Sequence, residues 1–417
     1  MDSKINETDT SLPKGNAVYI NRLNKIKVLG LIRERGTISR AEIVEITGLS
    51  APTVSRIVKG LSKEEKLIES VGMGDSSGGR PPVMLKFRGE QSYVIGIDLG
   101  ATTTRGVLSD LNGEFIEEIE FPTRLSEGFE QIVGDVAWLI QKLSGSSRKV
   151  ASARIFGVGI AVAGLVDHQK KRIEYSPDFK WHQVDIAGAL REKVDLPIIF
   201  DNVTRLMALG GLSYGKGMKS RDFICINVGY GIGAGVIVNG ELLTGTRGFA
   251  GEFGHITMDR NSRIQCSCEK YGCLEALASG RAIAQAAQRQ LSEGRESLLT
   301  EMCRGNIDSV TAKIVAETAR QGDALALKVF NEASEYLGIG IASLINLFNP
   351  EMVLIGGGVS LAGDIFFDNI RKVVDQHVMQ SSGRDLQILP MAFGENAALM
   401  GAFALVLNRV LNLSLVT

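Results

Sequence analysis

One histidine and three cysteines lie close together in the chain, in a pattern typical of a metal site. His255 is followed by Cys266, Cys268 and Cys273, so four side chains that commonly bind metals fall within one short segment. One imidazole and three thiolates complete the tetrahedral shell that Zn²⁺ prefers. Because no position is left for water, the sequence predicts a structural rather than a catalytic zinc ion. The alternative is a group of reduced cysteines that holds no metal.

Two glycine-rich segments, each beside an apolar run, have the composition of phosphate-binding loops, and a third, a triple glycine after an apolar run, is suited to covering an adenosine. Backbone amides and hydroxyls in phosphate loops can surround a phosphate, and an aspartate at the start can lie near the accompanying metal ion. Tight turns also require glycine, so one segment alone is weak evidence, whereas three in this order favour nucleotide binding. The residues are Asp98, Gly100 and Thr102 in the first segment, Gly229, Gly231 and Gly233 in the second, and Gly356, Gly357 and Gly358 in the third.

The elements that must position these loops are short strands separated by glycine turns. Apolar runs at residues 94–98 and 106–110 flank the first loop, and runs at 223–228 and 233–238 flank the second. Two such similar strand–turn–strand openings predict an α/β body with duplicated lobes around a cleft. A long helix-rich half completes the chain.

The N-terminal part has the apolar spacing of three short helices, the last two of which form a helix-turn-helix pattern. Ser39 followed by Glu42 fits a capping box, Gly48 is placed to end the second helix, and Ser50 can cap the third. Such a pair is typical of DNA-binding domains whose second helix reads the major groove. The candidate DNA-contacting residues are Arg40, Ser50, Thr53, Ser55, Arg56, Lys59 and Arg80.

A wing is predicted directly after the helix-turn-helix. Strand-like runs at residues 67–71 and 83–87 are joined by a glycine-rich segment that carries Arg80. A loop of this kind can grip phosphates or a minor groove, and the alternative is a linker between domains. Lysine and arginine outnumber acids between Pro13 and Phe87, which fits a surface facing nucleic acid but also a solvated basic face.

The overall composition is that of a soluble protein with more than one domain. The chain has 417 residues, of which 44% are hydrophobic and 22% charged, and its net charge is −1. The 5 cysteines are too few for a disulfide scaffold. The polar N-terminus lacks the apolar core of a signal peptide, and no apolar run approaches membrane-spanning length. We therefore expect a cytoplasmic protein without membrane contact.

Together these motifs resemble the ROK family of repressors, open reading frames and kinases, in its transcription-regulator branch of the NagC/XylR type. The resemblance covers essentially everything after the polar N-terminus. The motifs that carry it are residues 39–43, 47–50 and 78–82 near the N-terminus, and residues 98–105, 229–235, 250–255, the cysteine cluster and 356–358 in the body.

This resemblance implies an α/β protein with an N-terminal winged helix-turn-helix and a two-lobed, actin-like ATPase domain of the ROK sugar-kinase type. The implied division is a disordered tail at 1–15, a DNA-binding domain at 16–90 and a ROK domain at 91–417. In that domain, lobe one is expected at about 91–205 plus 397–417 and lobe two at about 206–396.

The resemblance also implies roles for individual residues. In family members, the counterparts of Asn202, Glu252, His255 and Glu275 hold the sugar, so these four are the expected sugar-binding residues. Zinc is expected on His255 and the three clustered cysteines. His255 would then serve twice, with one ring nitrogen on zinc and the other toward the sugar.

Four departures from the family pattern bear on function. Val203 stands where family kinases carry the catalytic aspartate, and loss of that base lowers a rate by roughly 10²–10⁴. Tyr230 replaces a small threonine, and its ring would crowd a triphosphate. Asp178 replaces an asparagine near the sugar, and Glu269 replaces a glycine between the cysteines.

The sequence therefore predicts a sugar-responsive transcriptional regulator, a repressor of carbohydrate uptake or catabolism genes, with no catalytic residue and with vestigial phosphate loops. The expected partners are operator DNA, a sugar or sugar-phosphate effector, and further copies of the chain in a homodimer or homotetramer. The alternative is an ATP-dependent sugar kinase with an appended DNA-binding domain, which would require Asp201 to supply the base through a local bulge. A constitutive DNA-binding protein with a dead pocket is less consistent with the retained sugar-binding residues.

Overall fold

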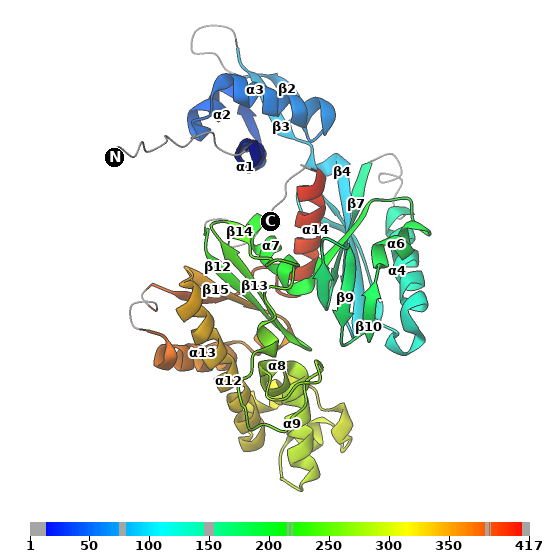
Figure 1. The fold of residues 1–417 in the computed structure, drawn as a ribbon, viewed down its shortest axis with the longest axis vertical. Coiled ribbons are helices and arrows are strands. Elements are labelled where there is room, and N and C mark those ends of the chain that lie inside the picture. The colour runs from blue at the N-terminus through cyan, green and yellow to red at the C-terminus, as the bar shows by residue number, and fades with distance from the viewer. Residues whose placement is uncertain are drawn as a thin grey trace, which may run out of the picture. The chain divides into compact units, whose positions relative to one another are not determined.

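The structure is a computed structural model that describes residues 14–74, 81–145, 154–214, 217, 220–379, 383 and 385–410. The chain divides into two compact units (Figure 1). Of the described residues, one comprises those up to Ser92 together with 407–410, and the other those from Tyr93 to Val406. Each is described by itself below.

In its described residues, the first unit contains three α-helices and a three-stranded sheet. The strands are antiparallel and lie in the order β1-β3-β2. A short π-helical turn, Gly60–Glu64, continues the third helix. The elements are α1 (Lys14–Arg35), β1 (Thr37–Ser39), α2 (Arg40–Thr47), α3 (Ala51–Lys59), β2 (Ile68–Met73) and β3 (Val83–Phe87).

Local side-chain chemistry sets the ends of the two central helices. The amide of Glu42 donates to Ser39 Oγ at 3.2 Å and the amide of Ser39 donates to Glu42 Oε2 at 2.8 Å, which completes the predicted capping box. Gly48 ends α2 with a left-handed φ of 69°, and Ser50 Oγ accepts from the amide of Thr53 to begin α3. The helix-turn-helix spacing is thus confirmed at both caps.

Two features of this unit differ from the expectations. The sequence predicted strands here only at residues 67–71 and 83–87, yet Thr37–Ser39 forms a further strand that pairs with β3 and buries Ile38. The helix α1 begins at Lys14, inside the segment expected to be a tail. Residues 1–13, and Arg80 in the predicted wing, lie outside the described residues.

The second unit is built on two five-stranded sheets. The first has the strand order β11-β7-β4-β5-β6, and the second has the order β14-β13-β12-β15-β16. A third, small sheet has the order β10-β9-β8, and its strands lie between β7 and β11 in the sequence. The strands are β4 (Ser92–Leu99), β5 (Thr103–Asp110), β6 (Phe115–Pro122), β7 (Arg154–Val162), β8 (Leu165–Asp167), β9 (Arg172–Ser176), β10 (Trp181–Val184), β11 (Ile198–Asn202), β12 (Phe223–Val228), β13 (Ile232–Val238), β14 (Glu241–Leu242), β15 (Met352–Gly356) and β16 (Gln387–Pro390).

The two sheets share a connectivity, as the duplicated openings predict. In each, three consecutive strands pair antiparallel, β4–β5–β6 and β12–β13–β14, and two later strands pair with each other in parallel, β7 with β11 and β15 with β16. The helices are α4 (Gly128–Gly145), α6 (Ile186–Arg191), α7 (Val203–Tyr214), α8 (Leu274–Ala278), α9 (Gly280–Ser292), α10 (Leu299–Met302), α11 (Ala312–Arg320), α12 (Ala324–Phe348), α13 (Asp364–His377) and α14 (Ala397–Val410).

Two helices, α7 and α14, join the sheets into one core. Leu206 and Leu209 of α7 share a buried cluster with Phe223 of β12 and with Ala402 of α14. The helices touch backbone to backbone, because a Cβ on Gly401 would fall 1.9 Å from the carbonyl oxygen of Leu206. Since α7 begins directly at the end of β11, this contact holds the N-terminus of α7 in a fixed place.

Candidate functional site

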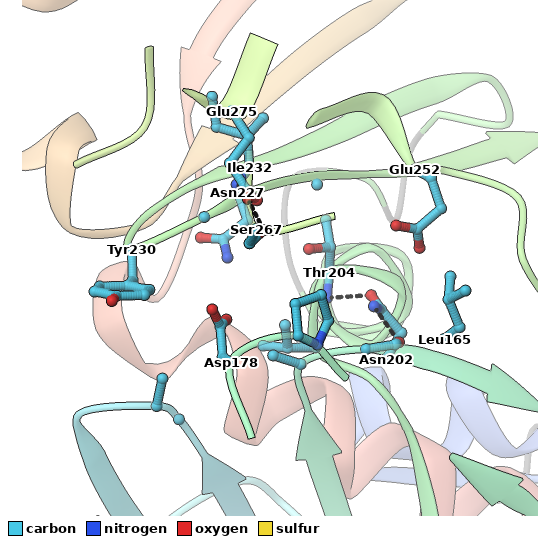
Figure 2. Close-up of a pocket in the computed structure, with 18 of the residues that line it drawn as sticks. Leu165, Asp178, Asn202, Thr204, Asn227, Tyr230, Ile232, Glu252, Ser267 and Glu275 are labelled. Carbon is cyan, nitrogen blue, oxygen red and sulfur yellow. Dashed lines mark hydrogen bonds between the residues drawn. The ribbon is translucent and has the colours of Figure 1, made fainter. Parts of the chain in front are cut away.

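A cavity of about 340 Å³ lies where strands of both sheets end (Figure 2). Its volume is in the range of pockets that hold small molecules. The carboxyl ends of β4, β11 and β12 contribute, as is usual for ligand sites in α/β folds. The predicted site residues that line it are Asp98, Gly100, Thr102, Gly231, Gly233, Asn202, Glu252, His255 and Glu275, together with Asp178, Val203, Tyr230 and the ligand Cys268.

Asn202 is the last residue of β11, and it also caps α7. Its Oδ1 accepts from the amides of Thr204 at 2.9 Å and Arg205 at 3.3 Å. Its Nδ2 donates to the carbonyl of Gly164 at 2.9 Å, as Figure 2 shows. One Nδ2 hydrogen is left to face the cavity, so the cap fixes the direction of the donor that a ligand would meet.

Glu275, in the first turn of α8, is 8% exposed and hydrogen-bonded from several sides. Its Oε2 accepts from the amide of Ile232 at 3.1 Å, while Oε1 accepts from Ser267 Oγ at 2.6 Å and from Arg281 Nη2 at 3.3 Å. This carboxylate thus ties the second glycine loop to the segment that carries the cysteines. The roles of Ser267 and Arg281 were not predicted, although Ser267 stands between two candidate metal ligands in the sequence.

His255 presents its two ring nitrogens to different partners. Its Nδ1 lies 3.6 Å from Cys266 Sγ, and its Nε2 lies 3.8 Å from Glu252 Oε2 at the cavity wall. Burial raises the pKa of Glu252 above its usual range, and His255 opposes that shift. This arrangement has the geometry for one nitrogen on a metal and the other toward a ligand.

The predicted metal-binding side chains do come together. The ligand atoms of His255, Cys266, Cys268 and Cys273 all lie within 4.8 Å of one another, and Cys268 Sγ is 3.7 Å from Cys273 Sγ. Sulfur atoms about 3.8 Å apart are what a tetrahedral ion with metal–sulfur bonds of about 2.3 Å requires. Burial, with Cys266 nearby, raises the pKa of Cys273 to about 12, so a bound cation is needed to make this side chain a thiolate at neutral pH.

The turn that carries the cysteines accommodates Glu269 where the family pattern has a glycine. Glu269, in place of glycine, has a left-handed φ of 66°. A non-glycine residue there costs about 1 kcal/mol but does not displace the neighbouring cysteines. Gly272, by contrast, has a φ of 70°, and a Cβ there would fall 1.9 Å from the carbonyl of Asp259. That glycine is required for Cys273 to reach the cluster.

Val203 and Asp201 have opposite environments. Val203 lines the cavity, whereas Asp201 is 0% exposed and is not among the residues that line it. Asp201 Oδ2 lies 3.3 Å from Arg205 Nη2, and its Oδ1 lies 3.4 Å from His168 Nε2. β11 pairs with β7 in unbroken register through Asn202, so these residues contain no bulge that would turn Asp201 toward the cavity.

Tyr230 stands between the first cavity and a second one of about 800 Å³, and lines both. The Arg281 guanidinium lies 5.2 Å from the centre of its ring, a cation–π contact. Gly229 lines only the second cavity, where Lys313 and Arg320 also lie. Residues of the first two glycine segments therefore line both cavities, and the Tyr230 side chain lies in the wall of each.

The candidate DNA-contacting residues lie on and beside α3 in the first unit. Arg40, Ser50, Ser55, Arg56 and Lys59 are exposed, and Thr53 is half-buried. The opposite side of α3 buries its apolar residues, as the sequence predicts. Arg56 Nη2 donates to Asn21 Oδ1 at 2.6 Å, a partner on α1 that the sequence did not reveal. Arg80 remains untested because it lies outside the described residues.

None of the described helices is both long enough and apolar enough to cross a bilayer.

Comparison with known proteins matches two separate parts of the chain to two family models. A ROK family model matches residues 94–409, and a winged helix-turn-helix DNA-binding model matches residues 22–67. The chain therefore belongs to the ROK family and carries an N-terminal winged helix-turn-helix, as the sequence motifs predict.

Its relatives include both regulators and kinases. The chain is 33% identical over 398 residues to a xylose repressor of Caldicellulosiruptor bescii, an alignment that covers 95% of this chain and 98% of the relative. The solved structure of a ROK family transcriptional regulator, a homologue of the E. coli MLC protein, matches with a TM-score of 0.79 and 26% identity, covering 94% of this chain and all of that one (100%). A ROK family glucokinase from Streptomyces griseus, in complex with glucose and AMPPNP, matches with a TM-score of 0.68 and 31% identity over 75% of this chain and 98% of that one.

Proposed function

We propose that this chain is a sugar-responsive transcriptional repressor of genes for carbohydrate uptake or catabolism, and that it does not phosphorylate its sugar. The observation that carries the proposal is a cavity lined by the four expected sugar-binding residues and by Val203, which the family resemblance aligns with the catalytic aspartate of kinases. An aliphatic side chain cannot accept the proton of an attacking hydroxyl. Repressor relatives that match nearly the whole chain, DNA-binding segment included, support the same function.

In this proposal the sugar lies among Asn202, Glu252, His255 and Glu275. The fixed Nδ2 of Asn202 donates to a sugar hydroxyl, and the Glu252 carboxylate accepts from one. His255 Nε2 faces the sugar while Nδ1 binds a structural zinc ion together with the three cysteines, and that ion holds the cavity wall in shape. Glu275 acts chiefly through the loop that it ties in place.

The kinase alternative would require a different base, and Asp201 is the nearest candidate in the sequence. Its full burial, its ion pair with Arg205 and the unbroken pairing of β11 argue against that role. Tyr230 argues against it independently, because it lines both cavities where family kinases carry a small threonine, and its ring would crowd a triphosphate.

On the DNA side, we propose that the exposed face of α3 enters the major groove and that Arg56 exchanges Asn21 for a base edge or a phosphate. A homodimer or homotetramer would present paired reading heads to a palindromic operator. The sugar changes operator affinity only to the extent that it binds one arrangement of the lobes more tightly than another.

The test uses the purified full-length protein, its own upstream DNA and a panel of aldopentoses, aldohexoses and N-acetylhexosamines. We expect at least one sugar to raise the thermal unfolding temperature and to change the retardation of the DNA. ATP-dependent phosphorylation of any sugar in the panel would contradict the absence of kinase activity. Failure to retard the DNA under every condition would contradict the regulatory function.

A further inference from the structure

The side chains that line the first cavity give it a strongly negative wall. Four carboxylates line it, from Asp98, Asp178, Glu252 and Glu275, and among its lining residues in the described structure there is no lysine or arginine. Figure 2 shows Asp178 and Glu252 on opposite sides of the space, near Thr204. A ligand in this cavity therefore meets negative charge from more than one direction.

Two arginines whose charges act on these carboxylates, Arg281 and Arg205, are already paired with acidic groups. Arg281 donates to Glu275 and stacks on Tyr230, so it offsets one carboxylate and faces the second cavity. Arg205 is paired with Asp201 in the interior and donates to the carbonyl of Gly248. A zinc ion with three thiolates and a neutral imidazole would add a net charge of about −1 at the same wall.

From this distribution we infer that the effector of the cavity is an uncharged sugar and that phosphorylated sugars are rejected electrostatically. This inference rests on the proposed function and narrows its effector from sugars and sugar phosphates to the unphosphorylated class. A phosphate monoester carries between one and two negative charges at neutral pH, and its recognition normally uses arginine, lysine or a helix N-terminus. Here the N-terminus of α7 is already capped by Asn202.

Binding to the full-length protein can be measured by calorimetry with matched pairs: glucose and glucose 6-phosphate, xylose and xylose 5-phosphate, N-acetylglucosamine and its 6-phosphate. For any neutral sugar that binds, we expect its phosphate ester to bind at least about tenfold more weakly. An ester that binds as tightly as its parent sugar would overturn the inference and leave the proposed function standing. If neither member of any pair binds, nor any sugar of the wider panel, the proposed function itself fails.

A second measurement separates electrostatic from steric rejection. Asp178→Asn removes one charge with little change in shape. The dissociation constant of the phosphate ester, divided by that of its parent sugar, should therefore fall several-fold. The exposed control Asp195→Asn should leave this ratio unchanged. Raising NaCl from about 20 mM to about 500 mM should also narrow the ratio. If neither change alters this ratio of dissociation constants, the rejection of phosphate esters is not electrostatic and the inference is overturned.

Discussion

Asp201 and Arg205 form an ion pair in the protein interior, with Asp201 Oδ2 3.3 Å from Arg205 Nη2 and both side chains almost fully buried. The pair joins the end of β11 to the first turn of α7. Asn202, which directs its amide into the cavity, stands between the two partners in the chain. The pair therefore supports the site without belonging to it, and the buried Arg205 also bonds His168 at 2.8 Å.

Asp201→Asn should destabilise the fold strongly, because it leaves Arg205 as a buried charge without its counter-ion. We expect a loss of about 3–5 kcal/mol in the free energy of unfolding, measured by urea titration. Glu127→Gln breaks an ion pair that is about half exposed on both sides, and should cost less than about 1 kcal/mol. Equal effects of the two variants would contradict the structural role of Asp201.

Gly401→Ala should separate α7 from α14. The added Cβ would meet the Leu206 carbonyl oxygen at 1.9 Å, so the helices must move apart, at a cost of about 1–3 kcal/mol or more. Gly134→Ala in α4 is the matched control, since its Cβ would meet nothing within 4 Å. It should stabilise the protein by about 0.5–1 kcal/mol. The two substitutions should therefore shift the thermal midpoint in opposite directions, and a shift of the same sign would refute the close contact.

Removal of one proposed metal ligand should release the ion. Cys273→Ala should lose stoichiometric zinc, measured by elemental analysis of the purified protein, and should unfold at a lower temperature. Cys303→Ala, which removes a buried thiol outside the cluster, should retain the metal. Retention of full zinc content by the Cys273 variant would show that the cluster is not the binding site.

The carboxyl of Asp98, a half-buried residue in the cavity wall, should make stability depend on pH. Burial raises its pKa from 3.8 to about 6 in the folded state, so the folded protein binds a proton more readily than the unfolded chain. Its contribution to stability should therefore decline as pH rises from about 4 to about 6, by up to about 2–3 kcal/mol, and stay low above that range. Asp98→Asn should then be more stable than the natural protein at pH 8, with a smaller difference at pH 4.5. Urea titrations of both proteins at the two pH values measure this difference. A variant that is less stable than the natural protein at pH 8 would contradict the prediction.

Arg56→Ala should weaken binding to the natural operator by about 1–3 kcal/mol if this side chain reads a base edge, as measured by fluorescence anisotropy. Lys63→Ala, on the turn that follows α3, serves as an exposed basic control and should have a smaller effect. An equal loss on random DNA would identify Arg56 as a phosphate contact instead. No loss on either DNA would remove it from the interface.

The sequence by itself determined the features whose causes are local. The capping box of Ser39 and Glu42, the left-handed Gly48 and the spacing of the three cysteines each depend on a few neighbouring residues, and the structure contains all of them. The repeated strand–turn–strand pattern likewise predicted two similar sheets, because alternation of apolar strands and glycine turns is encoded within each segment.

Only the tertiary structure decided which side chains line the cavity and which are paired with other groups in the protein interior. The sequence left open whether Asp201 supplies the base that Val203 cannot, but pairing with Arg205 buries Asp201 while Val203 lines the cavity. The ties of Glu275 to Ser267 and Arg281, and the bond of Arg56 to Asn21, were also not predicted. Such contacts form when separate elements pack together, and no propensity of a local segment records them.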